Sequence, residues 1–237
     1  MSPAKRAEMQ KNFDHFLRRA KLAFNDPELL LHAFTHRSYL NETKSGMREH
    51  NERLEFLGDA VIELIVTDHL YRMFPKAHEG ELTSYRAALV NAVMLGSIAH
   101  KLGMNDCLLL SKGEAKDTGR ARSTILANTF EAVLGALYLD QGYAAAEKFV
   151  TEFVLSHTDD VIKKGLWKDA KSSYQEHAQS KYGLTPLYKT LSAKGPDHDK
   201  HFVVALMVGD VEVARGEGKS KQDAEQAAAV AALADKS

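Results

Sequence analysis

The chain has 237 residues, of which 44% are hydrophobic and 27% are charged, and its formal net charge is −1. This composition is typical of a globular protein with a real core, and the balanced charge does not by itself indicate a nucleic-acid partner. The single cysteine, Cys107, excludes a disulfide within the chain and a cysteine-based zinc cluster. No apolar run approaches the ~18 residues that span a bilayer, and the N-terminal stretch lacks the apolar core of a signal peptide. We therefore expect a cytoplasmic protein with no membrane partner.

The first part of the chain, residues 10–157, is expected to form an all-α domain. Its apolar residues recur at helical spacing, and turn-forming stretches separate the segments that carry this pattern. The predicted helices cover residues 27–36, 51–73, 81–102, 123–142 and 144–158.

The pattern changes after a linker predicted near residues 157–168. Residues 169–236 carry short alternating or β-branched segments between two helical ones, which indicates a small α+β domain of order α-β-β-β-α. The predicted elements are a helix ending at Gly183, strands at 186–195, 200–209 and 211–218, a hairpin turn at Gly209–Asp210, and an alanine-rich helix over 220–235.

The stretch "NERLEFLGDAV" places acids along one side of a predicted helix. Glu52, Glu55 and Asp59 stand at i, i+3 and i+7, within a sector of about 60° at 100° per residue, and Glu63 extends the row. Such a row fits the solvated face of an amphipathic helix. Asn51 and Glu52 also fit a helix N-cap followed by an acid in the first turn.

A second polar pair stands in a helix that is apolar almost all round. Asn128 and Glu131 are the exceptions in "TILANTFEAVLGALYL", and burying an unpaired carboxylate is costly. A basic partner such as Arg53 or Arg86 would compensate Glu131, and so would a divalent cation shared with the first acidic helix. The pattern leaves both readings open.

A shared cation would be a hard ion held by oxygen ligands, namely Mg²⁺ with Mn²⁺ as substitute. Such an ion activates water and neutralises charge growing on a phosphodiester, so the site predicts phosphoryl chemistry. The sequence has neither a Gly-x-Ser-x-Gly nucleophile elbow nor a dinucleotide-binding loop. We therefore expect no organic cofactor.

Several long motifs together resemble the ribonuclease III family. "NERLEFLGDAV" is similar to the family signature, and "AFTHRSYLNE", "FPKAHEGELTSYRAALV" and "STILANTFEAVLGALYLDQG" match the catalytic domain in order and spacing. "SYQEHAQ", "GPDHDKHF" and "GEGKSKQDAEQAAA" resemble the double-stranded RNA-binding domain. The resemblance implies a homodimeric, Mg²⁺-dependent endoribonuclease that cuts both strands of double-stranded RNA. Its products would have 5′-phosphate and 3′-hydroxyl ends with short 3′ overhangs, from structured precursors such as rRNA and some mRNA and tRNA.

The resemblance also implies roles for individual acids. Asp59 and Glu131 match catalytic residues, Glu52 matches an outer acid, and Glu79 matches an acid that approaches the active-site region. The implied metal site consists of Glu55, Asp59, Asn128 and Glu131.

Asn128 is a departure, because the family usually has aspartate at this position. Asparagine keeps a carbonyl oxygen that can ligate a metal, but it removes one negative charge. We therefore expect retained activity with weaker metal affinity.

In the second domain, duplex RNA would be read by shape, through contacts to 2′-hydroxyls and phosphates. Gln222 and Asp223 replace two basic residues that the family commonly has, which predicts modest binding. The implied RNA contacts are Gln175, Glu176, His198, Lys219 and Lys221.

The loop "SKGEAKDTGRAR", with Lys112, Lys116, Arg120 and Arg122, would either add affinity for RNA or form a solvated turn. Two rival functions stay open beside the nuclease: a catalytically silent protein that holds duplex RNA, and a helical metal-dependent phosphohydrolase. Gly58 is expected to let its helix pack closely against another helix, either within the chain or from a second copy across a dimer axis.

Overall fold

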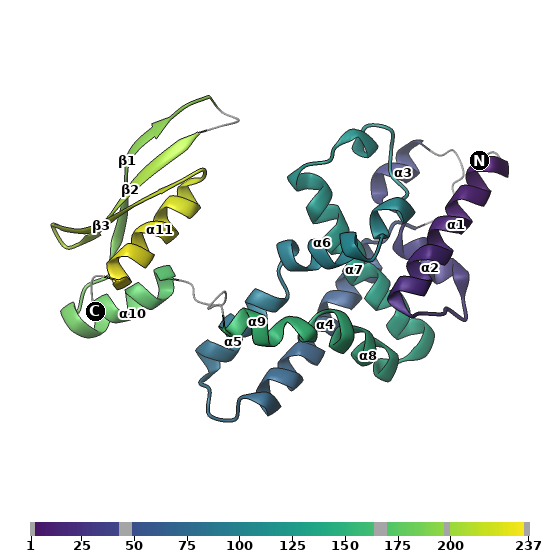
Figure 1. Cartoon of the computed structure of the whole chain (residues 1–237), viewed down its shortest axis with the longest axis horizontal. Coiled ribbons are helices and arrows are strands. Elements are labelled where there is room, and N and C mark those ends of the chain that lie inside the picture. Colours follow the sequence, from purple (N-terminus) through teal and green to yellow (C-terminus); the bar gives the residue numbers. More distant parts are fainter. Residues whose placement is uncertain (1–2, 43–48, 164–169, 197–199, 235–237) are drawn as a thin grey trace. The chain divides into compact units, whose positions relative to one another are not determined.

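The computed structural model describes residues 3–42, 49–163, 170–196 and 200–234. The chain divides into two compact units, Met1–Trp167 and Lys168–Ser237. The first unit is helical, and the second combines a three-stranded sheet with two helices (Figure 1). The predicted fold class, an all-α domain followed by an α-β-β-β-α domain, is confirmed.

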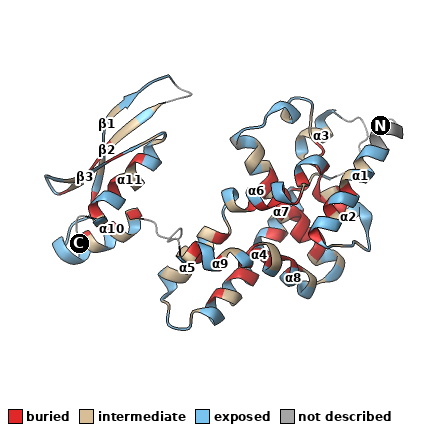
Figure 2. Ribbon diagram, viewed as in Figure 1, coloured by how far each residue is buried: buried red, intermediate tan, exposed pale blue. Residues whose placement is uncertain are grey.

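The first unit contains α-helices and short 3-10 turns. The α-helices are α1 (Pro3–Ala20), α2 (Pro27–Ala33), α3 (Arg37–Glu42), α4 (Glu52–Met73), α5 (Glu79–Leu89), α6 (Ala92–Lys101), α7 (Arg120–Gln141), α8 (Tyr143–Phe153) and α9 (Thr158–Lys163). The 3-10 turns are η1 (Met104–Cys107), η2 (Glu114–Lys116) and η3 (Leu155–His157). Buried residues concentrate on α4 and α7, which pack against each other at the centre of the unit (Figure 2).

Glycines on both central helices permit their close approach. A Cβ added at Gly58 of α4 would overlap the backbone oxygen of Glu131, and one added at Gly135 of α7 would overlap the backbone oxygen of Leu54. The expectation that Gly58 permits close helix packing is therefore confirmed. Its partner is α7 of the same chain, so the alternative of a twin helix across a dimer axis is wrong for this residue.

Gly58→Ala should destabilise the helical unit by about 3 kcal/mol or more, because α4 and α7 would have to move apart along their buried faces. Thermal or denaturant unfolding measures this. Gly80→Ala is the matched control: a Cβ at this position of α5 meets nothing within 4 Å, so alanine should stabilise by about 0.5–1 kcal/mol through helix propensity. Equal stability of the two variants would contradict the packing argument.

One predicted helix is two helices in the structure, and part of the predicted linker is helical. The helix expected over residues 81–102 is divided at Asn91, whose extended backbone begins α6 and whose side chain accepts a hydrogen bond from the Met94 N–H at 2.9 Å. The same side chain donates to carbonyls at the end of α5, so one residue caps both helices. The predicted linker is partly helical, because α9 occupies residues 158–163 and buries Val161.

The second unit contains α10 (Ala170–Tyr182), β1 (Leu187–Lys194), β2 (His201–Val208), β3 (Val211–Gly218) and α11 (Lys221–Ala234). The strands form an antiparallel sheet of order β1-β2-β3. As predicted, α10 ends before Gly183 and the β2–β3 turn contains Gly209, and both glycines have positive φ, +67° and +59°.

The alanine-rich α11 packs directly on β3. Ala224, Ala228 and Ala229 are fully buried, and a Cβ at Gly216 of β3 would overlap backbone atoms of Ala224 and Ala228. The absence of large side chains on both surfaces therefore lets this helix lie close to the sheet.

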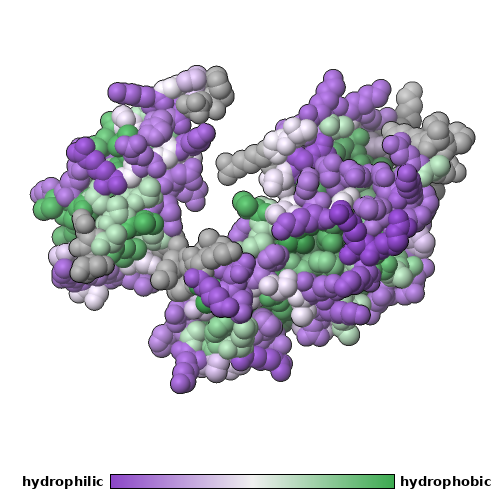
Figure 3. Space-filling model, viewed as in Figure 1, coloured by the Kyte–Doolittle hydropathy of each residue, from purple (hydrophilic) through white to green (hydrophobic). Residues whose placement is uncertain are grey.

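None of the helices described is both long enough and apolar enough to cross a membrane. The surface in view is mostly hydrophilic, with smaller apolar areas on both units (Figure 3).

Candidate functional site

The packing of α4 on α7 brings the two acidic segments together. Gly58, at the point of closest approach, faces the backbone of Glu131, and Glu55 and Asp59 flank it on α4. Asn128 lies one turn before Glu131 on α7, where its side chain hydrogen-bonds to Glu55. The helix crossing therefore joins the residues that periodicity placed on separate helices.

Glu131 is a half-buried carboxylate among other carboxylates. Burial, with added charge repulsion from Asp59, Glu55 and Glu63, raises its pKa to about 7. Of the two basic partners considered, Arg53 pairs with Glu49 at 3.1 Å and Arg86 with Glu63 at 2.8 Å. Among the residues described, no cation pairs with Glu131, so neither Arg53 nor Arg86 is its partner.

Glu55, Asp59, Asn128 and Glu131 form the acidic cluster of the site. Asn128 acts as a hydrogen-bond donor in this cluster. Burial raises the pKa of the Glu55 carboxyl, and repulsion by Glu52 and Asp59 adds to the rise. The hydrogen bond from the Asn128 amide opposes it, because the bond favours the charged carboxylate. A neutral amide at this position thus relieves part of the repulsion that an aspartate would increase.

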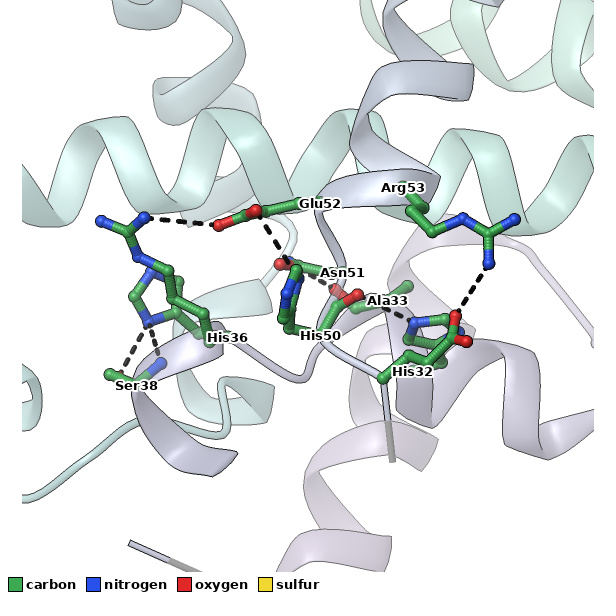
Figure 4. Close-up of polar contacts among 10 residues, drawn as sticks. His32, Ala33, His36, Ser38, His50, Asn51, Glu52 and Arg53 are labelled. Atoms are coloured by element: carbon green, nitrogen blue, oxygen red, sulfur yellow. Dashed lines mark hydrogen bonds and ion pairs between the residues drawn. The ribbon is translucent and has the colours of Figure 1, made fainter. Parts of the chain in front are cut away.

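Glu52 lies at the outer end of the cluster and is held by two basic side chains. Arg37 Nη1 lies 3.5 Å and His50 Nδ1 lies 3.7 Å from its carboxylate (Figure 4). Half of the Glu52 side chain is exposed, 49%, so these contacts orient the carboxylate more than they stabilise the fold. Glu79 lies exposed in the first turn of α5 and is not among the charges that raise the pKa of Glu131.

The donor set fits a hard divalent cation. The described parts of the chain contain no group of three or more His, Cys, Asp or Glu side chains already arranged around a metal position. Even so, Glu55, Asp59 and Glu131 supply carboxylate oxygens and Asn128 a carboxamide oxygen, the ligands that Mg²⁺ and Mn²⁺ prefer. The raised pKa of Glu131 marks a location where positive charge is favourable.

A polar cleft of about 450 Å³ opens beside the cluster. Its lining residues are His36, Arg37, Asn51, Glu52, Glu55, Glu114, Ala121, Thr124, Ile125 and Asn128. Sequence reasoning assigned no role to His36 or Glu114, because the periodicity of α4 and α7 does not show which neighbouring segments fold against them. The only available signal was that "AFTHRSYLNE" stands among the motifs of the resemblance.

In the second unit, Gln175 and Glu176 are exposed on α10. Together with Ser172, Gln179 and Ser180 they line one shallow pocket, so the structure brings these two predicted RNA contacts together. Lys219 is exposed between β3 and α11. His198, another predicted RNA contact, lies outside the described residues.

Contacts at the N-terminus of α11 explain why Asp223, one of the two non-basic residues there, is an acid. Ser220 Oγ accepts a hydrogen bond from the Asp223 N–H at 3.1 Å and donates to its carboxylate at 2.7 Å. Ser220 therefore caps the helix, and the Asp223 carboxylate holds the Ser220 hydroxyl in place. Lys221 lies 3.8 Å from Glu225, which also binds Lys171 at 2.6 Å, so neighbouring acid reduces the positive charge available at this end.

In the basic loop of residues 111–122, one cationic side chain, that of Arg122, binds the backbone of the loop itself. The Arg122 guanidinium donates to the backbone oxygens of Glu114 and Asp117 at 2.9 Å and 3.0 Å. The Lys112 N–H binds the carboxylate of Glu42 at 3.1 Å. Both contacts hold the loop against its surroundings, and the Lys112 and Lys116 side chains are exposed.

Comparison with known proteins agrees with this architecture. The family model described as "Ribonuclease-III-like" matches residues 26–158, and the "Double-stranded RNA binding motif" matches residues 170–236. The chain is 42% identical over 226 residues to "Ribonuclease 3" of Borreliella afzelii, covering 95% of this chain and 92% of the relative. It is 46% identical over 210 residues to "Ribonuclease 3" of Oleidesulfovibrio alaskensis, covering 89% and 91%.

Among solved structures, the nuclease domain of ribonuclease III from Campylobacter jejuni is 37% identical, with a TM-score of 0.56. The match covers 62% of this chain and 96% of that domain. The predicted resemblance is thereby confirmed over both units. The chain belongs to the ribonuclease III family, with a nuclease domain followed by a double-stranded RNA binding motif.

Proposed function

We propose that this protein is a cytoplasmic endoribonuclease that hydrolyses both strands of double-stranded RNA and depends on a divalent cation, Mg²⁺ or Mn²⁺, without an organic cofactor. Its products carry 5′-phosphate and 3′-hydroxyl ends with short 3′ overhangs. Its substrates are structured precursors such as rRNA, and some mRNA and tRNA. The observation that carries the proposal is the half-buried Glu131, whose raised pKa and acidic neighbours favour a bound cation beside a polar cleft.

Within this proposal, Glu55, Asp59, Asn128 and Glu131 hold the ion, and Asp59 and Glu131 are the catalytic residues. When bound, a divalent cation activates water and neutralises the charge that grows on the phosphodiester. The Asn128 amide, turned toward Glu55 by its hydrogen bond, favours the charged form of that carboxylate. Arg37 and His50 hold Glu52 at the mouth of the cleft, where it supports the site from outside the ligand set. Glu79 is the more distant supporting acid.

RNA is held by the second domain, residues 169–236, while the domain of residues 10–157 cuts it. Exposed polar side chains of α10, Gln175 and Glu176, contact a minor groove. Lys219 and Lys221 contact phosphates beside the N-terminus of α11, where the helix dipole favours negative charge. His198, which stands between β1 and β2 in the sequence, makes a second minor-groove contact.

We further propose that the active form is a homodimer. Phe56, Ala60 and Leu64 recur every four residues on α4 and are exposed, Phe56 to 80% and Leu64 to 58%. A row of exposed apolar side chains, two of them large, on the helix that carries the acids is best explained by a second copy of the chain. One solved relative, from Campylobacter jejuni, is described by the flexibility of its region involved in dimer formation.

Phe56→Asp should weaken the dimer by roughly 100-fold or more, because a two-fold axis removes the apolar contact twice and buries two charges. Sedimentation or light scattering across a concentration series measures the change. Val211→Asp is the matched control, since Val211 is 64% exposed but lies in the second unit. A Phe56→Asp protein that dimerises as tightly as the control would contradict the assignment of this face.

The function itself is tested with a long, perfectly paired RNA duplex, incubated with the full chain in Mg²⁺, in Mn²⁺ or in EDTA. Short duplexes with 5′-phosphates that form only with the divalent ion support the proposal. Protection of the duplex without cutting would support the rival, a binding protein, for which the neutral Asn128 is the observation in favour. Cleavage of small phosphoesters with the duplex left intact would support the phosphohydrolase.

A further inference from the structure

The backbone of His36 is held firmly beside the start of α4. Its N–H donates to the Leu109 oxygen at 3.1 Å, and the preceding residue, Thr35, forms a β-bridge with Leu109. The Thr35 oxygen in turn accepts the Asn51 N–H at 2.9 Å. These bonds join three segments of the chain and set His36 next to the first turn of the acidic helix.

The hydrogen bonds of the His36 ring determine which nitrogen carries the proton. The Ser38 N–H lies 3.3 Å from Nδ1, and a backbone N–H can only donate, so Nδ1 is an acceptor. The Ser38 hydroxyl, 2.8 Å from Nδ1, accepts the Ser111 N–H at 3.1 Å and directs its own proton to the ring (Figure 4). In the neutral ring the proton is therefore on Nε2.

The ring is neutral near pH 7. Burial lowers the pKa of His36 below its ordinary value, and this outweighs the opposite effect of Glu114. Arg37 and His50 lower the pKa further, while Glu52 raises it. The Nε2–H is thus an uncharged donor with a fixed direction.

His36 lines the cleft beside Glu55 and Asn128, and none of the hydrogen bonds among the described residues occupies its Nε2. The charged lining of this cleft is otherwise mostly acidic, and acids repel a phosphodiester. An uncharged donor suits this location, because a cation there would pair with the carboxylates, as Arg37 does with Glu52. The Nε2–H of His36 therefore lacks an acceptor among the described residues, and a nonbridging phosphate oxygen would supply one.

We propose that His36 is a substrate-contacting residue, whose Nε2–H donates a hydrogen bond to a nonbridging oxygen of the scissile phosphate in the cleft. This inference rests on the proposed nuclease function. Ser38 acts as a positioning residue, since it holds the ring in the required tautomer.

Two substitutions of His36 separate the effect of the Nε2–H donor from that of the contact between Nδ1 and Ser38. His36→Asn keeps an acceptor near the Nδ1 position for Ser38 but removes the Nε2 donor, whereas His36→Gln places an amide near the Nε2 position. We expect His36→Asn to slow single-turnover cleavage of a duplex by about 10- to 100-fold. Its Mg²⁺ midpoint and melting temperature should match those of the wild type. His36→Gln should recover most of the rate.

Equal rates for His36→Asn and the wild type would overturn the inference, and a loss confined to His36→Gln would assign His36 to the Ser38 contact alone. Equal losses in both variants would also overturn it, because they would assign His36 to the packing of its ring. Failure of the wild type to cut any duplex would instead overturn the proposed function. A duplex with sulfur in place of one nonbridging oxygen tests the contact without any variant. Sulfur accepts a hydrogen bond poorly but binds Mn²⁺ better than Mg²⁺.

We expect the wild type to cut one of the two sulfur diastereomers slowly in Mg²⁺ and equally slowly in Mn²⁺. On that substrate His36→Asn should add little further loss, because the oxygen and the donor form one contact. Full recovery of both diastereomers in Mn²⁺ would show that only the ion contacts these oxygens, and the inference would fail.

Discussion

Glu131→Gln should abolish duplex cleavage and at the same time raise the melting temperature of the ion-free protein at pH 8. The folded-state pKa of Glu131, about 7, lies above its ordinary value of 4.5, so the folded protein holds this proton more tightly than the unfolded chain. Ionisation therefore costs the folded state stability as the pH rises from about 4.5 through 7, and the full cost applies above that range. Glutamine does not ionise and avoids it.

The expected gain at pH 8 is of the order of 1–2 kcal/mol, which allows for solvent screening of a side chain that is only partly buried. This corresponds to a few degrees in melting temperature for a domain of this size. The difference should nearly vanish at pH 5, where Glu131 of the wild type is protonated. Glu147→Gln, which removes an exposed carboxylate of α8, is the control and should give no comparable gain.

Thermal unfolding in EDTA at the two pH values, and single-turnover cleavage in Mg²⁺, measure the two effects. Added Mg²⁺ should stabilise the wild type more than Glu131→Gln, because the ion binds the folded wild type through the missing carboxylate. Equal melting temperatures at pH 8 in EDTA would mean that a positive group already compensates Glu131. The argument for a bound cation would then lose its basis.

Asn128→Asp is expected to lower the Mg²⁺ midpoint of cleavage by about tenfold. A fourth carboxylate adds attraction for the ion of the order of 1–2 kcal/mol at the effective dielectric of a partly exposed site. The same change removes the hydrogen bond to Glu55 and adds a like charge, so the ion-free protein should become less stable at pH 8. The stability effect is thus opposite in sign to that of Glu131→Gln.

Magnesium titrations of the cleavage rate, paired with unfolding in EDTA, measure both consequences. Asn128→Ala provides the other limit, because it removes the carboxamide oxygen and should raise the midpoint. An unchanged midpoint in Asn128→Asp would show that residue 128 does not face the ion. The weaker metal affinity expected for the natural asparagine would then be wrong.

The fold and the acidic helices could be predicted from the spacing of apolar and polar residues within single segments of the sequence. Helical periodicity placed Glu55 and Asp59 on one face and singled out Asn128 and Glu131, and these features lie within single helices, where spacing determines direction. Periodicity could not locate the break at Asn91, because both flanking helices share an apolar pattern and only the cap separates them.

Contacts between distant segments account for what sequence reasoning missed. Arg37 and His50 hold Glu52, and His36 meets the segment of residues 109–111, only after the chain has folded. A basic partner for Glu131 looked equally plausible in the sequence, since nothing in it shows that Arg53 and Arg86 bind Glu49 and Glu63. The assignment of the ligands and of the RNA contacts stays a prediction.

Asn51 has a consequence for the design of a minimal nuclease fragment. Instead of capping α4, its side chain donates to the Ala33 oxygen at 3.0 Å, and its N–H binds Thr35. The residue is 3% exposed. The acidic helix is therefore anchored by the segment that follows α2, although all the proposed ligands lie after residue 51. A fragment that begins at α4 would keep every ligand yet lose the anchor of their helix, so a shortened enzyme should start before Pro27.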